Sequence, residues 1–338
     1  MSRHLHHPLA GFVARRLGQA LVVVLLAYVF VFVVISILPG DPVTNVLRDP
    51  QNGFTQEEID QIIAAQGLDQ PIHQQLWSSL TSFLRGDWGI SYRSGRPVSD
   101  LIAEVLPSTL ILASVGLFFA LVFALAIAYG TQFLPRRFGQ GVLRAFPSLF
   151  LSIPNFVIGL VLIQVFAFHL GLFRVIEPDS FWATVFAGIA LAIPVSAPIA
   201  EVLTANLDHE SRQEYTPVAR SRGLAHGTLF ARHLIKPASL PVVTIIALTV
   251  GELLGGSLIT ETIFGRTGVG SLVQRSVTTQ DLPVLQAVVS AAPVVFVVVN
   301  LFADLIYPVL DPRVRLIDIA RGSRAQVAGP VRDVSAVA

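Results

Sequence analysis

The chain has 338 residues, of which 53% are hydrophobic and only 13% are charged. Soluble globular proteins usually carry roughly a quarter charged residues, so this composition argues against a soluble domain and for a chain embedded in a membrane. The net charge of +1 provides no global field that would recruit nucleic acid, and the lack of cysteine excludes disulfides and thiolate metal sites.

Six stretches are long and apolar enough to cross a bilayer, which takes about 20 residues because hydrocarbon cannot satisfy free backbone groups. The first is too long for a signal peptide, and no small-residue cleavage site follows it. Prolines interrupt the third, fourth and sixth, which fits either a bundle around a pathway or ordinary kinks. The sequence therefore predicts an all-α polytopic membrane protein with about six transmembrane helices. The stretches are Leu17–Leu38, Thr109–Phe133, Phe146–Leu170, Phe181–Leu203, Pro241–Ile259 and Val284–Leu305.

Residues 39–107 separate the first two stretches and should form a small helical subdomain outside the membrane. Thr55 and Glu58 have the spacing of a capping box, which predicts a helix behind Thr55. Pro71 should open a second helix, whose apolar residues recur every fourth position. Val98–Leu106 reads as a short amphipathic segment before the second stretch. The same region contains a polar turn, which is either an idle loop or a contact for an external partner. The turn comprises Ser91, Tyr92, Arg93, Ser94, Gly95 and Arg96.

The connection between the fourth and fifth stretches, residues 206–239, is the most polar segment on its side of the membrane. Pro217 is unfavourable inside a helix, so it should lie at the start of a short helix over Thr216–Arg222 that ends at Gly223. Such a helix can transmit movement from a soluble partner, or it can simply anchor to anionic headgroups. The single lysine, Lys236, is not preceded by glycine, which excludes a phosphate-binding P-loop.

Four polar side chains lie within or beside the last two stretches. A carboxylate there costs several kcal/mol unless it is paired or hydrated, so each marks either a pathway or gate, or a contact with a neighbouring helix or subunit. We favour such contacts for Glu252 and Asp304, and we expect Glu261 to order the turn over Phe264–Gly270. The four residues are Glu252, Glu261, Asn300 and Asp304.

Most of the 23 basic residues lie in four segments on one side of the membrane. Because positive charge gathers in cytoplasmic loops, these segments are predicted to be cytoplasmic. The prediction places the N-terminal segment 1–16 and the C-terminal tail 309–338 in the cytoplasm. Between them lie the first transmembrane helix 17–38, the external subdomain 39–107 and a five-helix core, 108–308.

Short motifs occur along the chain in a fixed order. Taken together, they resemble the B-type membrane subunits of dipeptide and oligopeptide ABC importers over about Arg15 to Arg315. The motifs are Leu38–Pro42, Gly67–Pro71, Gly86–Ser91, Ser152–Phe156, Ala219–Leu224, Gly255–Gly256, Glu261–Phe264, Gly268–Gly270 and Asp311–Arg313.

The resemblance implies a type I ABC importer permease fold in a bacterial cytoplasmic (inner) membrane. The implied partners are a second, C-type permease subunit, one or two cytoplasmic ATPases that bind ATP and Mg, and an extracytoplasmic solute-binding protein that delivers a peptide. No cofactor, metal or catalytic residue is expected in this chain. Ser91–Arg96 would contact the binding protein. The implied ATPase-coupling residues are Tyr215, Ala219, Arg220, Ser221, Arg222 and Gly223.

Three alternatives stay open. The same architecture could import nickel complexes, glutathione or another small solute. A stand-alone secondary transporter or channel would show inverted repeats, and the two halves show no convincing repeat. An intramembrane hydrolase would need a second histidine at metalloprotease spacing after His209, or a Gly-x-Ser-x-Gly motif, and the sequence has neither.

Overall fold

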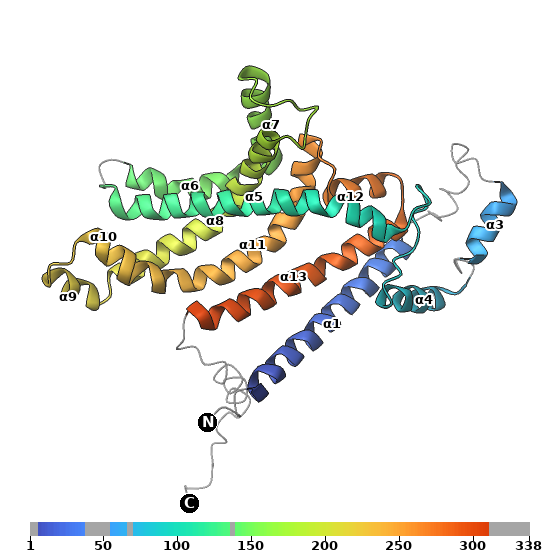
Figure 1. The fold of residues 1–338 in the computed structure, drawn as a ribbon, viewed down its shortest axis with the longest axis horizontal. Helices are drawn as coiled ribbons and strands as arrows, with labels where there is room; N and C mark the ends of the chain where they lie inside the picture. Colours follow the sequence, from blue (N-terminus) through green and yellow to red (C-terminus); the bar gives the residue numbers. More distant parts are fainter. Residues whose placement is uncertain (1–5, 38–54, 66–69, 136–138, 311–338) are drawn as a thin grey trace, which may run out of the picture.

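The computed structural model describes residues 6–37, 55–65, 70–135 and 139–310. These residues form helices and contain no strand, only one isolated bridge between Ile90 and Pro97. The helices, shown in Figure 1, are α1 (His6–Ile37), α3 (Gln56–Ala65), α4 (Ile72–Leu84), α5 (Val98–Phe133), α6 (Gln140–Ser152), α7 (Asn155–Leu162), η3 (Ile163–His169), α8 (Phe181–Ser211), α9 (Tyr215–Ser221), α10 (His226–Leu229), η4 (Phe230–Leu234), α11 (Ile235–Phe264), α12 (Val269–Thr278) and α13 (Leu282–Leu310).

The long helices run between two ends of the bundle (Figure 1). Helices α9 and α10 lie at one end, which we call the α9 end, and α3, α4 and α12 lie at the other, which we call the α12 end. Helix α8 is central, since it packs against α5, α6, α7 and α11. The two ends therefore carry the connections, and the middle is a bundle of apolar helices.

The six predicted spans all fall on helices of this bundle. Among the described residues, α5, α8, the run His226–Phe264 and the α13 segment Leu282–Val299 are each long and apolar enough to cross a membrane. The bent pair α6 and α7–η3 would make a fifth crossing. Helix α1 carries the first predicted span and is 32 residues long. The prediction of a polytopic, all-α membrane fold is therefore confirmed.

The third predicted span is broken at Pro154. Helix α6 and the pair α7–η3 meet there at 101°. Ile153 has an extended backbone, with φ −98° and ψ 121°, and Pro154 precedes the first residue of α7. A residue before proline avoids the helical region, so α6 has to end here. As a result α7 projects away from the long axis of the bundle (Figure 1).

The fourth and sixth spans are not broken, contrary to the prediction from their prolines. Helix α8 runs through Pro194 and Pro198, and α13 runs through Pro293. In α8 the hydroxyl of Ser196 donates to the Ile193 carbonyl at 2.7 Å. Helix α8 packs against α5, α6, α7 and α11, which is the setting in which prolines are tolerated within membrane helices.

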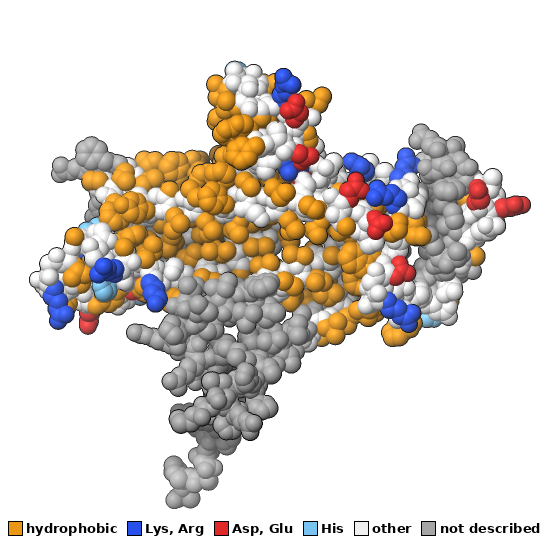
Figure 2. Space-filling model, viewed as in Figure 1, with side chains coloured by type: hydrophobic (Ala, Val, Ile, Leu, Met, Phe, Trp, Pro, Cys, Tyr) orange, Lys and Arg blue, Asp and Glu red, His pale blue; other side chains and the backbone are white. Residues whose placement is uncertain are grey.

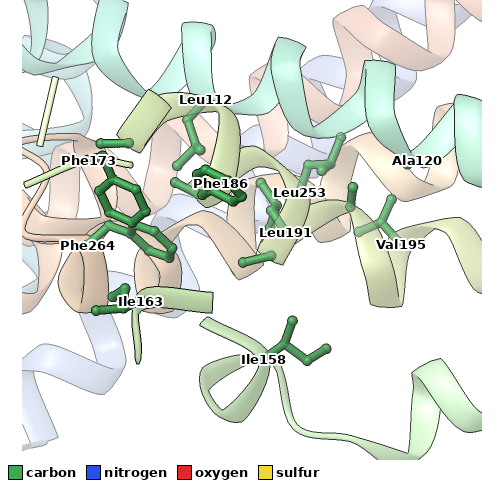
Figure 3. Packing of buried hydrophobic residues seen from close by; sticks show 14 residues of the cluster. Leu112, Ala120, Ile158, Ile163, Phe173, Phe186, Leu191, Val195, Leu253 and Phe264 are labelled. Carbon is green, nitrogen blue, oxygen red and sulfur yellow. The ribbon is translucent and has the colours of Figure 1, made fainter. Parts of the chain in front are cut away.

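Small residues and stacked rings pack the core shown in Figure 3. A side chain on Gly188 would overlap Val115, so glycine is required where α8 crosses α5. Close approach through small residues is the usual basis of helix packing in membranes. Phe186 stacks on Phe166 at 4.4 Å and on Phe173 at 5.3 Å between ring centroids, and such pairs contribute about 1 kcal/mol each. These contacts join η3 and the loop that follows it to α8.

The segment between α3 and α5 shows two confirmed predictions and one error. The Thr55 N–H donates to Glu58 Oε2 at 2.8 Å and the Glu58 N–H donates to Thr55 Oγ1 at 3.3 Å, which completes the capping box. Hydrogen bonds from Thr55 also lower the pKa of Glu58. Pro71 precedes α4 as expected. Val98–Leu106, however, is no separate segment, because α5 runs without a break through Pro107 and across the predicted boundary at 107/108.

Hydrophobic side chains cover the middle of the visible face, whereas most charged side chains lie near the two ends and on the projection formed by α7 (Figure 2). Helix α5 alone exposes Leu110 (50%), Phe118 (60%) and Leu125 (49%). A continuous apolar surface of this extent is unfavourable in water and matches a surrounding bilayer.

Candidate functional site

Helix α9 is fixed to the end of α8. Pro217 is its third residue, where a backbone N–H has no helical acceptor, so proline costs nothing there. The Tyr215 hydroxyl donates to the Glu210 carboxylate at 2.7 Å, and buried Thr216 donates to the Glu210 carbonyl at 3.2 Å. Burial and the adjoining Glu210 raise the pKa of Tyr215 to about 12, so the phenol keeps its proton and this bond at neutral pH.

Gly223 ends α9 in a Schellman motif. Its N–H donates to the Arg220 carbonyl at 2.9 Å, and the Leu224 N–H donates to the Ala219 carbonyl at 3.2 Å. Gly223 has a φ of +82°, a left-handed conformation that glycine adopts without the cost borne by other residues. The predicted short helix with a terminal glycine is therefore present and begins one residue earlier than expected.

The predicted coupling residues do not share one face of α9. Ala219 packs inward against the apolar cluster beneath the helix. The side chains of Arg220, Ser221 and Arg222 are exposed, as is Val218 at 51%. Neither arginine forms an ion pair within the described chain. Helix α9 thus presents two free cations and an apolar side chain at the tip of the bundle, and Val218 had not been singled out from the sequence.

A second set of polar contacts at the α9 end was not predicted from the sequence. Asp208 of α8 accepts two hydrogen bonds from Arg144 of α6, at 2.7 and 3.1 Å, and one from Gln132 of α5 at 2.9 Å. Bidentate carboxylate–guanidinium pairs are among the stronger polar contacts. Three helices, α5, α6 and α8, are therefore held together at the α9 end.

At the α12 end, the turn over Ser91–Arg96 is held by Asp281. The buried Ser91 hydroxyl and the Tyr92 N–H, at 3.1 Å, both donate to the Asp281 carboxylate. The Ser91 N–H donates to the Arg96 carbonyl at 2.9 Å, and Gly95 takes a φ of +67°. Ser91 therefore points inward, while the residues from Arg93 to Arg96 are exposed.

Asp281→Ala should loosen this turn, because it removes both acceptors from a buried hydroxyl and a backbone N–H, at a cost of about 2 kcal/mol. Trypsin should then cleave after Arg93 about tenfold faster, measured by fragment appearance under native conditions; the bond after Arg96 is resistant because Pro97 follows it. Asp100→Ala, which removes an exposed carboxylate nearby, serves as the control. Equal cleavage rates for the two variants would contradict this role of Asp281.

Glu261 is fully buried where α11 turns into α12. Its carboxylate accepts hydrogen bonds from the Thr109 hydroxyl at 2.6 Å and from the Ser271 N–H at 3.0 Å. The Thr109 oxygen in turn accepts the Val269 N–H at 2.8 Å. A carboxylate is favourable here because the first N–H groups of α12 have no helical partner. The structure thus places Glu261 at the turn between two helices and joins both to α5.

Arg266 completes this network from the other side and was not identified from the sequence beyond its charge. The side chain is 4% exposed and donates to the Pro178 carbonyl at 2.6 Å, to Thr184 Oγ1 at 2.7 Å and to Ser108 Oγ at 3.2 Å. It also pairs with Asp179 at 3.3 Å. Burial lowers the pKa of Arg266, but a guanidinium keeps its charge at any physiological pH.

The remaining predicted polar residues differ in environment. Glu252 is exposed on α11 and makes no hydrogen bond or ion pair with any described residue, so the pairing favoured for it is not found within this part of the chain. The side chains of Asn300 and Asp304 lie outside the described residues. A side chain on Gly256 would come within 3.0 Å of Leu191, whereas Gly255 faces open space.

Known proteins resemble this chain in sequence and in fold. Residues 116–316 match the family described as binding-protein-dependent transport system inner membrane component, and residues 9–113 match its N-terminal region. The glutathione transport system permease protein GsiC of Salmonella choleraesuis is 31% identical over 306 residues, which cover 90% of this chain and 99% of GsiC. The Escherichia coli K12 protein of the same name is 30% identical with the same coverage. An inward-facing structure of the MetNI methionine ABC transporter contains a chain with a TM-score of 0.52 and 17% identity, covering 62% of this chain and 96% of that one.

Proposed function

Because the chain belongs to the family of binding-protein-dependent transport system inner membrane components, we propose that it forms half of the translocation pathway of an ATP-driven importer of small peptides. The chain is a permease subunit of an ABC importer and a multi-pass inner membrane protein. The other half of the pathway belongs to a second, homologous permease subunit. An extracytoplasmic binding protein delivers the cargo.

The observation that carries this proposal is α9. It is short, capped at Gly223, tied to α8 through Tyr215, and it exposes Arg220 and Arg222. A helix of this kind suits the groove of an acidic soluble partner, here one or two ATPases that bind ATP and Mg. This assignment puts the α9 end in the cytoplasm, in agreement with the distribution of basic residues, and both chain termini on that side.

In the proposed mechanism this chain makes and breaks no covalent bond. ATP binding closes the ATPases, which displace α9. The displacement passes to α8 through the Tyr215–Glu210 bond, and to α5 and α6 through Asp208. Because the bundle moves as packed bodies, the pathway alternates between inward-facing and outward-facing states. At the other end, Arg93 and its neighbours in the turn held by Asp281 contact the binding protein.

The proposed cargo is a small peptide, and glutathione is the first solute to test because the relatives at 30–31% identity carry that name. Glutathione is a tripeptide, so both cargoes share a free ammonium group and free carboxylates. Nickel complexes would instead need a pathway that accepts a chelated cation.

Reconstitution tests the function directly. The complete complex in proteoliposomes, with its binding protein outside and ATP inside, should accumulate labelled glutathione or a labelled dipeptide. Uptake should vanish when the P-loop lysine of the ATPases is replaced, and this chain alone should transport nothing. Transport by the chain alone would favour a stand-alone channel instead.

Charge reversal of both exposed arginines, Arg220→Glu with Arg222→Glu, should weaken binding of the ATPases by at least about tenfold, because like charges face each other across the interface. Co-purification of the ATPases with the membrane subunits measures this effect. Arg232→Glu, another exposed arginine in the same connection, is the matched control. Retention of the ATPases by the double variant would argue against α9 as their docking site.

A further inference from the structure

The exposed side of α11 carries a carboxylate, Glu252, near the middle of the helix. Its exposed residues recur every three or four positions and therefore form a single stripe along the helix. We call it the α11 stripe, and it consists of Pro241, Thr244, Leu248, Glu252, Gly255, Ile259 and Thr262.

The exposed side of α5 provides an internal comparison. One exposed polar residue, Ser114, lies over the part of α5 predicted to span the membrane, and its hydroxyl donates to the Leu110 carbonyl at 2.7 Å. The others are aliphatic or aromatic, among them Phe118, Val122 and Leu125. This composition suits lipid. The α11 stripe, with the exposed carboxylate of Glu252, does not, because an ionised group facing hydrocarbon costs several kcal/mol.

We propose that the α11 stripe lines the aqueous pathway and that Glu252 binds the ammonium group of the cargo as it passes. This inference rests on the proposed function. Glu252 is the eighteenth residue of the 30-residue helix α11, close to its middle, and it has no partner among the described residues.

Two features favour cargo over a fixed partner. Gly255, less than one turn from Glu252, has no atom within 4 Å of where a side chain would begin, which leaves room beside the carboxylate. A single hydrated carboxylate also holds an ammonium group weakly, by about 1 kcal/mol, so the cargo can leave again. Peptides and glutathione all carry such an ammonium group at their α-amino end.

Water access can be tested without knowing the cargo, because the chain contains no cysteine. In the complete complex, Glu252→Cys and Leu248→Cys should react with a water-soluble cationic thiosulfonate. The matched variant Phe118→Cys on the lipid side of α5 should react at least about tenfold more slowly, because thiolate forms poorly in hydrocarbon. Equal protection of Cys at positions 252 and 118 would overturn the pathway assignment.

The ammonium contact is tested by Glu252→Gln. The number of glutathione or dipeptide molecules transported per ATP hydrolysed should fall about fivefold to tenfold, because a charge-assisted contact is lost. Glu252→Asp should restore part of this transport ratio. Glu57→Gln, an exposed carboxylate on α3, should match the wild type. An unchanged ratio for Glu252→Gln would overturn the proposal.

A reduced yield of the second permease subunit with Glu252→Gln would also overturn the proposal, since Glu252 would then pair with that subunit. If the wild-type complex shows no ATP-dependent uptake, the proposed function itself fails. The cysteine experiment still reports water access in that case, so the two failures are distinguishable.

Discussion

Gly223→Pro should abolish ATP-driven uptake while the protein still inserts into the membrane and assembles. Proline fixes φ near −65°, but Gly223 has a φ of +82°, and proline also lacks the N–H that bonds to the Arg220 carbonyl. The end of α9 has to unwind, so the helix no longer moves as one body with α8. Uptake in proteoliposomes and ATP hydrolysis by the same samples measure the loss of coupling, which we expect to exceed about a hundredfold given a strain of about 3 kcal/mol.

Two further variants calibrate this result. Gly223→Asn should retain substantial uptake, since asparagine enters the left-handed region more readily than other residues. Gly227→Ala should behave as the wild type, because this glycine has an ordinary helical backbone and open space around it. Normal uptake by Gly223→Pro would refute the assignment of α9 as the coupling element.

Gly270→Ala should destabilise the protein by about 3 kcal/mol or more, the cost of overpacking a site that cannot relax. The added methyl group would overlap the backbone of Leu258 and come within 2.9 Å of the Glu261 carboxylate. Backbone atoms of α11 cannot move aside without separating α11 from α12 and breaking the contact between Glu261 and Ser271. The apparent melting temperature of the purified complex, measured by intrinsic fluorescence, should fall accordingly.

Gly255→Ala is the control for that measurement because it lies in the same helix and faces open space. Replacing glycine by alanine inside a helix without a clash stabilises by roughly 0.5–1 kcal/mol, so the two variants should shift the melting temperature in opposite directions. A melting temperature for Gly270→Ala equal to that of the wild type would show that the turn between α11 and α12 adapts easily.

Composition and local chemistry determined much of this protein. Runs of about 20 apolar residues can only be membrane helices, which set the positions of the spans. The capping box at Thr55, the start of α4 behind Pro71 and the limits of α9 between Pro217 and Gly223 follow from contacts within one or two turns. Such contacts are readable because both partners lie within a few residues of each other.

The tertiary structure decided how these helices face one another. A helix ends at Pro154, whereas α8 continues through Pro194, because α8 packs against four other helices and α6 does not. Ser91 and Asp281 are 190 positions apart, and Thr109 and Glu261 are 152 apart. No local rule relates such residues. Glu261 is buried in a network, whereas Glu252, on the same helix, is exposed on the α11 stripe. The difference depends on which side of α11 the neighbouring helices cover, and that is decided only when the helices pack.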